Sequence, residues 1–133
     1  MVEDLRSLVP RGKGDIEGLR RLIGLGLPKI TPVLPDIVSW IQDINWPIAY
    51  EAGLFLSSVG RPLLPIVRDI LQTDDEVWKF NVLTIIVEDW SQELLEELRP
   101  ELERIERSPT AGELDYGVLP AVATELLDKI RAS

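Results

Sequence analysis

The stretch ITPVLPDIVSWIQDINWPIAYEAGLFLSSVG, residues 30–60, gives the clearest indication of the fold. Its first apolar residues recur at i, i+3, i+4, i+7, i+8 and i+11, which is the spacing of one face of an amphipathic helix. They are Ile30, Val33, Leu34, Ile37, Val38 and Ile41. Thr31 can cap this helix and Pro32 can occupy its first position. The stretch therefore begins with a predicted helix.

The rest of this stretch predicts a second helix, from about Trp46 or Pro47 to Val59. Asn45 can cap its start, and Gly60 can end it because glycine readily adopts a left-handed conformation. Two consecutive helices joined by a short turn form a hairpin. Working outward in both directions, we expect the same plan to continue.

A second pair of helices is expected after Gly60, with Pro62 at the start of the first one. Thr73 to Glu76 has the form of a capping box for the next helix, which should continue to about Asp89. Its stretch Val82 to Val87 is rich in β-branched residues and taken alone could be a strand. The polar residues Asn81, Thr84 and Glu88, which we expect to be exposed, favour a helix.

The C-terminal third predicts further helices. Ser91 can cap a segment that is expected to bend or restart near Pro100, because proline removes an interior hydrogen bond. A loop is expected from Ser108 to Gly112. The last helix shows its apolar residues on one face, namely Val118, Leu119, Val122, Ala123, Leu126, Leu127 and Ile130.

Sliding the chain on itself reveals an internal period. Pro35, Pro65 and Pro100 come into register at offsets of about 30 and 35 residues. A single hairpin cannot bury its apolar face alone, so neighbouring hairpins should stack. We predict an all-α protein of stacked antiparallel helix hairpins with about six or seven helices. Residues 1–133 should form one domain, with residues 1–14 as an extended N-terminal segment.

Two stretches carry a resemblance to known families. Leu34 to Gly60 resembles a HEAT repeat, with an Asp-containing turn and small residues in the second helix; the resemblance implies a short α-solenoid. The motifs QDINWP (Gln42 to Pro47) and DDEVWKF (Asp74 to Phe80) further resemble a family of small bacterial proteins known only as a domain of unknown function. That second resemblance implies a fold and no activity.

Composition narrows the classes of function. The chain of 133 residues has no cysteine and no histidine, so zinc sites and Ser-His or Cys-His catalysis are not expected. Its net charge is −9, and residues 34–133 hold eight basic against 19 acidic side chains. Nucleic-acid and anionic-membrane partners need dense positive charge, so we expect neither. No signal peptide or membrane span is evident, and a cytoplasmic protein is expected.

The candidate binding surface consists of the two motif turns. The repeat register predicts that they lie beside each other, and together they offer Gln42, Asp43, Asn45, Trp46, Asp74, Asp75, Trp78 and Lys79. Tryptophans provide contact area and charged neighbours provide selectivity. The structural alternative is that the aspartates cap helices and the tryptophans fill gaps between hairpins. Both can hold at once.

Other charged groups allow further hypotheses. The acidic run from Glu88 to Glu106 could dock a basic partner, or it could be a solvated face with ion pairs such as Glu97 with Arg104 or Glu103 with Arg107. Adjacent carboxylates on a helix diverge by about 100°, which argues against a catalytic or metal role. The basic residues Arg6, Arg11 and Lys13 could bind an acidic target or fold back on the acidic body.

Three classes of function follow. The leading hypothesis is a non-catalytic module that binds another protein, with a basic or neutral partner favoured, without a cofactor or metal. Some HEAT-like proteins are DNA glycosylases, so an enzyme acting on DNA is the alternative that the resemblance implies, although the acidic charge of this chain disfavours it. The third possibility is a structural, oligomerising unit.

Overall fold

The protein is all-α in the computed structural model, which describes residues 5–132 except the side chain of Arg6. Every regular element among these residues is a helix, so the predicted fold class is confirmed. The chain divides into two compact units, residues 1–56 and residues 57–133. We describe each unit by itself. None of the described helices is both long and apolar enough to cross a membrane.

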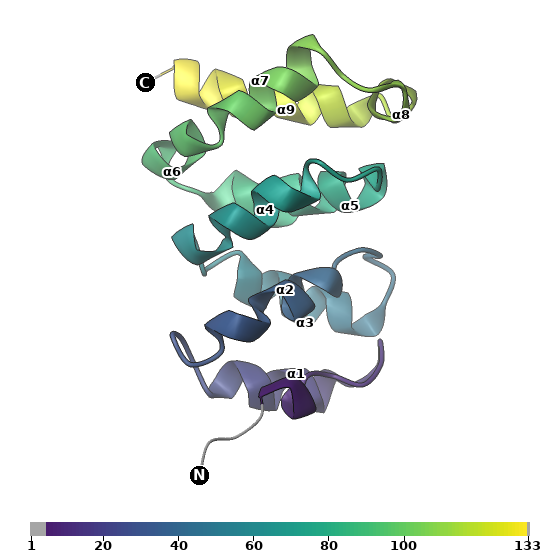
Figure 1. The fold of residues 1–133 in the computed structure, drawn as a ribbon, viewed down its shortest axis with the longest axis vertical. Coiled ribbons are helices and arrows are strands. Elements are labelled where there is room, and N and C mark those ends of the chain that lie inside the picture. Colours follow the sequence, from purple (N-terminus) through teal and green to yellow (C-terminus); the bar gives the residue numbers. More distant parts are fainter. Residues whose placement is uncertain (1–4, 133) are drawn as a thin grey trace. The chain divides into compact units, whose positions relative to one another are not determined.

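Unit 1 contains three α-helices and two 3-10 turns (Figure 1). These are η1 (Leu5–Leu8), α1 (Ile16–Gly24), η2 (Thr31–Val33), α2 (Leu34–Ser39) and α3 (Pro47–Leu56). Both α1 and α2 pack against α3. The six residues of the apolar stripe from Ile30 to Ile41 are each at most 1% exposed, which confirms that they share one buried face.

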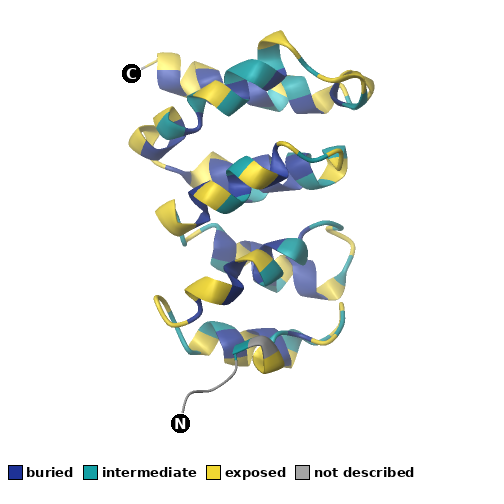
Figure 2. Cartoon of the chain, in the orientation of Figure 1, coloured by how far each residue is buried: buried dark blue, intermediate teal, exposed yellow. Residues whose placement is uncertain are grey.

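Unit 2 is built around its C-terminal helix. It contains η3 (Arg61–Leu63), α4 (Leu64–Ile70), α5 (Glu76–Asn81), η4 (Val82–Ile86), η5 (Val87–Asp89), α6 (Gln92–Glu97), α7 (Arg99–Arg107), α8 (Ala111–Asp115) and α9 (Val118–Arg131). Helix α9 packs along α7 and also contacts α5, α6, α8 and η4. Figure 2 shows the buried residues of α7 and α9 alternating with exposed ones along each helix. This pattern follows from the apolar spacing of their sequences.

The three prolines aligned by the internal period occupy equivalent places. Pro35, Pro65 and Pro100 each lie in the first turn of a helix, in α2, α4 and α7. The 3-10 turns before α2 and α4 also carry a proline near their starts, Pro32 and Pro62. Proline fits these positions because the first N–H groups of a helix have no intrahelical partner.

Several predicted helix boundaries are wrong. Thr31 does not cap a continuous helix, because a 3-10 turn precedes α2 and no side chain caps it. Helix α3 ends at Leu56 rather than Val59, although Gly60 does have a positive φ of 77°. Asp75, and not Thr73, caps α5: its carboxylate accepts a hydrogen bond from the N–H of Trp78.

The stretch from Val82 to Val87 is helical, but not for the predicted reason. A π-helical turn, η4, continues α5 and is followed by the 3-10 turn η5. Asn81, which we expected to be exposed, is only 3% exposed, whereas Glu88 is exposed. Asn81 is the last residue of α5 and precedes the π-turn, so the polar character of its side chain did not predict its burial.

The described residues also contain more helices than expected, nine α-helices instead of six or seven. Ser91 caps α6 and a new helix starts at Arg99, which confirms the predicted restart near Pro100. The expected loop from Ser108 to Gly112 instead leads into α8, which begins at Ala111. Residues 5–8 of the expected extended N-terminal segment form η1, which packs against α1 and η2.

Candidate functional site

The first motif forms a compact aromatic turn in unit 1. We call residues 40–46 the tryptophan turn; it connects α2 to α3. The rings of Trp40 and Trp46 lie edge to face, with centroids 5.9 Å apart and an interplanar angle of 70°. Such pairs add stabilisation beyond their buried area. The turn therefore contains a pair of packed aromatic rings in addition to its polar residues.

Hydrogen bonds hold the tryptophan turn in shape. The carboxylate of Asp43 accepts a hydrogen bond from the N–H of Asn45 at 2.9 Å, and the Asp43 carbonyl accepts one from the N–H of Trp46 at 3.1 Å. The N–H of Ile48 donates to the carbonyl of Lys13 at 2.9 Å, which ties the N-terminal segment to the first turn of α3. Asp43 thus stabilises the turn that precedes the helix.

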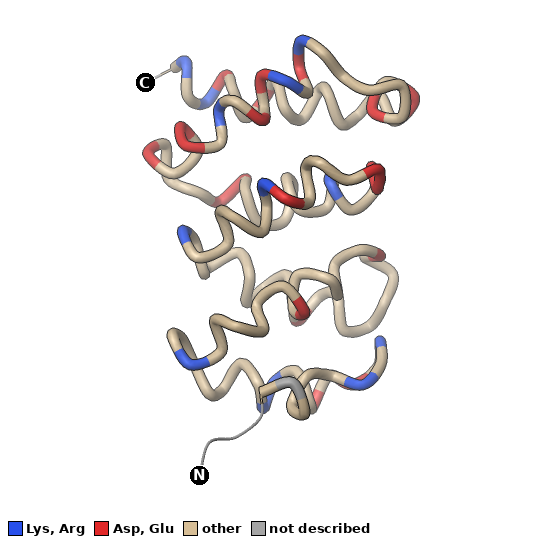
Figure 3. Tube along the Cα trace, in the orientation of Figure 1, with Lys and Arg blue, Asp and Glu red and all other residues tan. Residues whose placement is uncertain are grey.

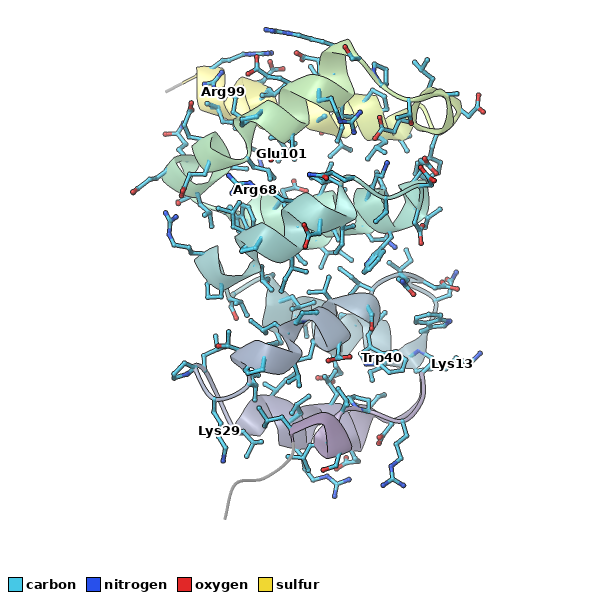
Figure 4. The ribbon with its side chains drawn as sticks, viewed as in Figure 1. Lys13, Lys29, Trp40, Arg68, Arg99 and Glu101 are labelled. Carbon is cyan, nitrogen blue, oxygen red and sulfur yellow. The ribbon has the colours of Figure 1, made fainter. Side chains whose placement is uncertain are left out.

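The outer side of this turn is unusually apolar. Ile44 is 59% exposed, while Trp40 and Trp46 are half-buried. Asn45 is exposed and Gln42 is half-buried. Trp40 is labelled in Figure 4. The turn therefore contains one exposed aliphatic side chain, two partly accessible indoles and two amide side chains.

The second motif lies at the start of α5 in unit 2. Asp74 is exposed, Asp75 caps the helix with a hydrogen bond of 3.0 Å, and Trp78 is half-buried. Asp75 therefore has the capping role of the structural alternative. The four candidate residues of each motif lie together within their own unit. The predicted juxtaposition of the two motifs stays a prediction.

Lys79 is buried, which corrects its expected place on a binding surface. It is 1% exposed, and its Nζ lies 2.9 Å from Oε2 of Glu113, which is 0% exposed. Arg104 contacts the same carboxylate with two donors, at 3.0 and 2.7 Å. Glu76 lies 3.9 Å from the ammonium of Lys79. We call Lys79, Arg104 and Glu113 the buried charge cluster; it joins α5, α7 and α8.

The electrostatics of Glu113 fit a structural role. Burial by itself would raise the pKa of its carboxyl, but hydrogen bonds from Arg104, the N–H of Thr110 and Lys79 outweigh burial and lower the pKa to about 2. The same carboxylate raises the pKa of the Arg104 guanidinium through their hydrogen bonds. Glu113 is therefore ionised at neutral pH with both oxygens occupied, unlike a general acid or base.

The acidic run is not an open negative face. Three of its carboxylates pair with arginines from other helices: Glu97 with Arg61, Glu101 with Arg68 at 3.2 Å, and Glu106 with Arg131 at 3.0 Å. Figures 3 and 4 show these opposite charges interspersed on unit 2, with Arg68 and Glu101 labelled. Such pairing removes much of the charge that a basic partner would meet.

The two ion pairs predicted within this run fared differently. Glu103 pairs with Arg107 at 3.0 Å, as expected for residues four apart on a helix. Glu97 does not pair with Arg104, because Arg104 turns toward Glu113 instead. Within the described residues, no group of three or more Asp and Glu side chains is placed to hold a metal ion.

Sequence reasoning missed two members of the charge cluster, Arg104 as a partner and Glu113 altogether. A signal for Glu113 was present. Thr110 and Glu113 form a complete capping box, in which each side chain accepts a hydrogen bond from the other residue's N–H. The pattern Thr-x-x-Glu is a known start signal for helices. Trp40 and Ile44 were also missed as parts of the aromatic turn.

Residues 8–127 match the model of a family described as a domain of unknown function, DUF5071. The chain belongs to this family. This match confirms membership of an uncharacterised domain family over most of the length, while the two motifs and the HEAT resemblance stay predictions. A search of curated proteins finds no match to the DUF5071 chain. Its function must therefore be argued from the geometry above.

Proposed function

We propose that this DUF5071 protein is a non-catalytic module that binds another protein, and that the tryptophan turn is its main contact surface. The exposed side chain of Ile44, in the same turn as the Trp40–Trp46 pair, is the observation that carries the proposal. Binding hot spots are enriched in tryptophan and lie in small apolar patches surrounded by polar groups. Gln42 and Asn45 supply such polar groups here.

The turn is also preorganised, which favours binding. Because Asp43 holds the backbone at Asn45 and Trp46, a partner would not have to order this loop, and the entropy cost of binding is smaller. The other half of the predicted surface contributes less. Lys79 is excluded by burial, and Asp75 is used as a helix cap. Asp74 and Trp78 stay possible secondary contacts.

Charge favours a protein over a nucleic acid as the partner. Residues 57–133 carry eight basic and 16 acidic side chains, a net charge of −8. A phosphate backbone would be repelled, whereas a neutral or basic protein would not. Because, among the described residues, seven of these 16 carboxylates are paired with arginines, we expect contacts of the tryptophan turn, and not long-range attraction, to dominate the affinity.

The test is affinity capture from a lysate of source cells, quantified by mass spectrometry, with the wild-type protein, Ile44→Asp and Leu114→Asp. Leu114 is a matched control because it is equally exposed, at 61%, but lies on α8 in unit 2. Both substitutions are at exposed sites and should change stability by less than about 0.5 kcal/mol. Thermal melts of each variant verify this.

We expect a protein that is retained by the wild type and by Leu114→Asp but lost by Ile44→Asp. Equal retention by all three proteins would refute the role of the tryptophan turn. Recovery of DNA, with an affinity that falls steeply as salt rises, would instead support the alternative of an enzyme acting on DNA.

A further inference from the structure

Unit 1 also contains a groove whose lining includes no residue of the tryptophan turn. It has a volume of about 760 Å³ and lies between η1 and α1. Its lining residues are Ser7, Leu8, Val9, Arg11, Asp15, Gly18, Arg21, Leu22 and Leu25. A volume of this size is within the range of pockets that hold small molecules, roughly 300–1,000 Å³.

The groove is amphipathic. Leu8, Val9, Leu22 and Leu25 supply an apolar wall, and Leu22 is nearly inaccessible at 1% exposure, so it belongs to the floor. Gly18 is also buried, and the absence of a side chain there makes room for the carboxylate of Asp15. Two arginines, Arg11 and Arg21, line the same groove and are both exposed. A hydrocarbon with one charged end matches such a lining.

The carboxylate in the groove does not neutralise these arginines. Asp15 is committed to the backbone: its Oδ2 accepts from the N–H of Arg11 at 3.1 Å and its Oδ1 from the N–H of Gly18 at 3.0 Å. These two hydrogen bonds chiefly lower the pKa of Asp15, and the charges of Arg21 and Arg11 add to the effect. Among these three side chains, the lining therefore carries two positive charges against one negative charge.

The two arginines of the groove differ from Arg20 of α1 in their ion pairing. Arg20 pairs with Glu51 at 2.7 Å and with Glu17 at 3.6 Å. Among the residues that the structure describes, neither the guanidinium group of Arg11 nor that of Arg21 has a carboxylate oxygen within 4.0 Å. Two cations with one committed carboxylate leave a local excess of positive charge. An anionic group entering the groove would be favoured there.

We propose that this groove binds a small amphipathic carboxylate, a hydrocarbon chain of medium length that ends in one carboxylate group. The carboxylate accepts hydrogen bonds from Arg11 and Arg21, and the hydrocarbon lies against Leu8, Leu22 and Leu25. This site is independent of the tryptophan turn. Its recognition requires both parts, because the arginines select the charge and the leucines bury the chain.

The test is isothermal titration calorimetry of the full chain with decanoate below its micelle concentration. Decyltrimethylammonium has a similar chain and the opposite charge, and serves as the control ligand. The variants are Arg11→Gln/Arg21→Gln, which removes both groove charges, and Arg20→Gln, which removes the paired arginine on the same helix. Circular dichroism melts verify that the variants remain folded.

We expect decanoate to bind the wild type and Arg20→Gln equally, and the double variant at least about tenfold more weakly, because charge-assisted hydrogen bonds are the stronger kind. Decyltrimethylammonium should bind none of them measurably. No heat with decanoate up to about 1 mM, equal binding of the two ligands, or unchanged binding by the double variant would each overturn the proposal. A second measurement, chemical shifts of Leu22 and Leu25 on titration, should locate the bound chain in the groove.

Discussion

Replacing Glu113 with glutamine tests how strongly unit 2 depends on the buried charge cluster. The substitution keeps the shape of the side chain and a carbonyl oxygen that can still accept from Thr110, but it removes the negative charge. Lys79 would then be left 1% exposed, with Glu76, 3.9 Å away, as the nearest carboxylate. Arg104 is 38% exposed and can turn to solvent. The loss of stability in Glu113→Gln therefore depends mainly on the stranded charge of Lys79.

Two arguments give similar magnitudes. Removing one partner of a buried ion pair costs about 3–5 kcal/mol, because the remaining charge is left uncompensated. Separately, the pKa of Glu113 falls from 4.5 to about 2, and at about 1.4 kcal/mol per pH unit this corresponds to roughly 3 kcal/mol of stability. We therefore expect Glu113→Gln to lower the free energy of unfolding by about 3 kcal/mol at pH 7.

Urea denaturation followed by circular dichroism measures this change. Glu125→Gln is the matched control, because Glu125 is exposed on α9 and its loss should change stability by less than about 0.5 kcal/mol. The double variant Lys79→Met/Glu113→Gln removes the stranded cation as well and should recover part of the loss. A loss below about 1 kcal/mol in Glu113→Gln would refute the reasoning. So would a double variant whose loss of stability equals the sum of the losses in the single variants Lys79→Met and Glu113→Gln.

Two further predictions concern the same unit. Because the pKa of Glu113 is 4.5 when unfolded and about 2 when folded, its contribution is complete above about pH 4.5 and is lost as the pH falls toward 2; urea titrations of wild type and Glu113→Gln should therefore converge over this range. Gly60 has φ 77° and ψ −132°, a conformation that side chains rarely adopt, so Gly60→Ala should cost roughly 1–3 kcal/mol in the same assay. Gly24→Ala is its control, since nothing lies within 4 Å of an added Cβ there and its φ is not positive; equal losses in both variants would contradict the backbone argument.

Local patterns predicted the helices well where they reflect local physics. The apolar stripe from Ile30 to Ile41 is buried as a whole, as its spacing predicts, although the stripe extends beyond both ends of α2. Ser91 caps α6 through its own hydroxyl, and Pro100 marks the start of α7, since both effects act within one turn of a helix.

Local sequence patterns gave wrong predictions where the burial of a side chain depends on residues far away in the sequence. Lys79 follows a half-buried tryptophan in a polar motif, and nothing within the motif indicates that it is buried. Its partner Glu113 is 34 positions away, directly after the segment from Ser108 to Gly112 whose Pro and Gly content indicated a loop. Asn81 is likewise buried at the end of α5, and its polar side chain alone gave no sign of this.

The tryptophan turn could be predicted only in part from its local sequence pattern. Its polar residues were recognised because turns favour them, whereas Ile44 was overlooked because a single aliphatic residue between helices has no periodic signal. Trp46 both packs against Trp40 and remains partly accessible, so truncating it would lower stability and binding together. Ile44 is exposed without being part of that aromatic pair. A charge placed at Ile44 therefore separates the role of this turn in binding from its role in the fold.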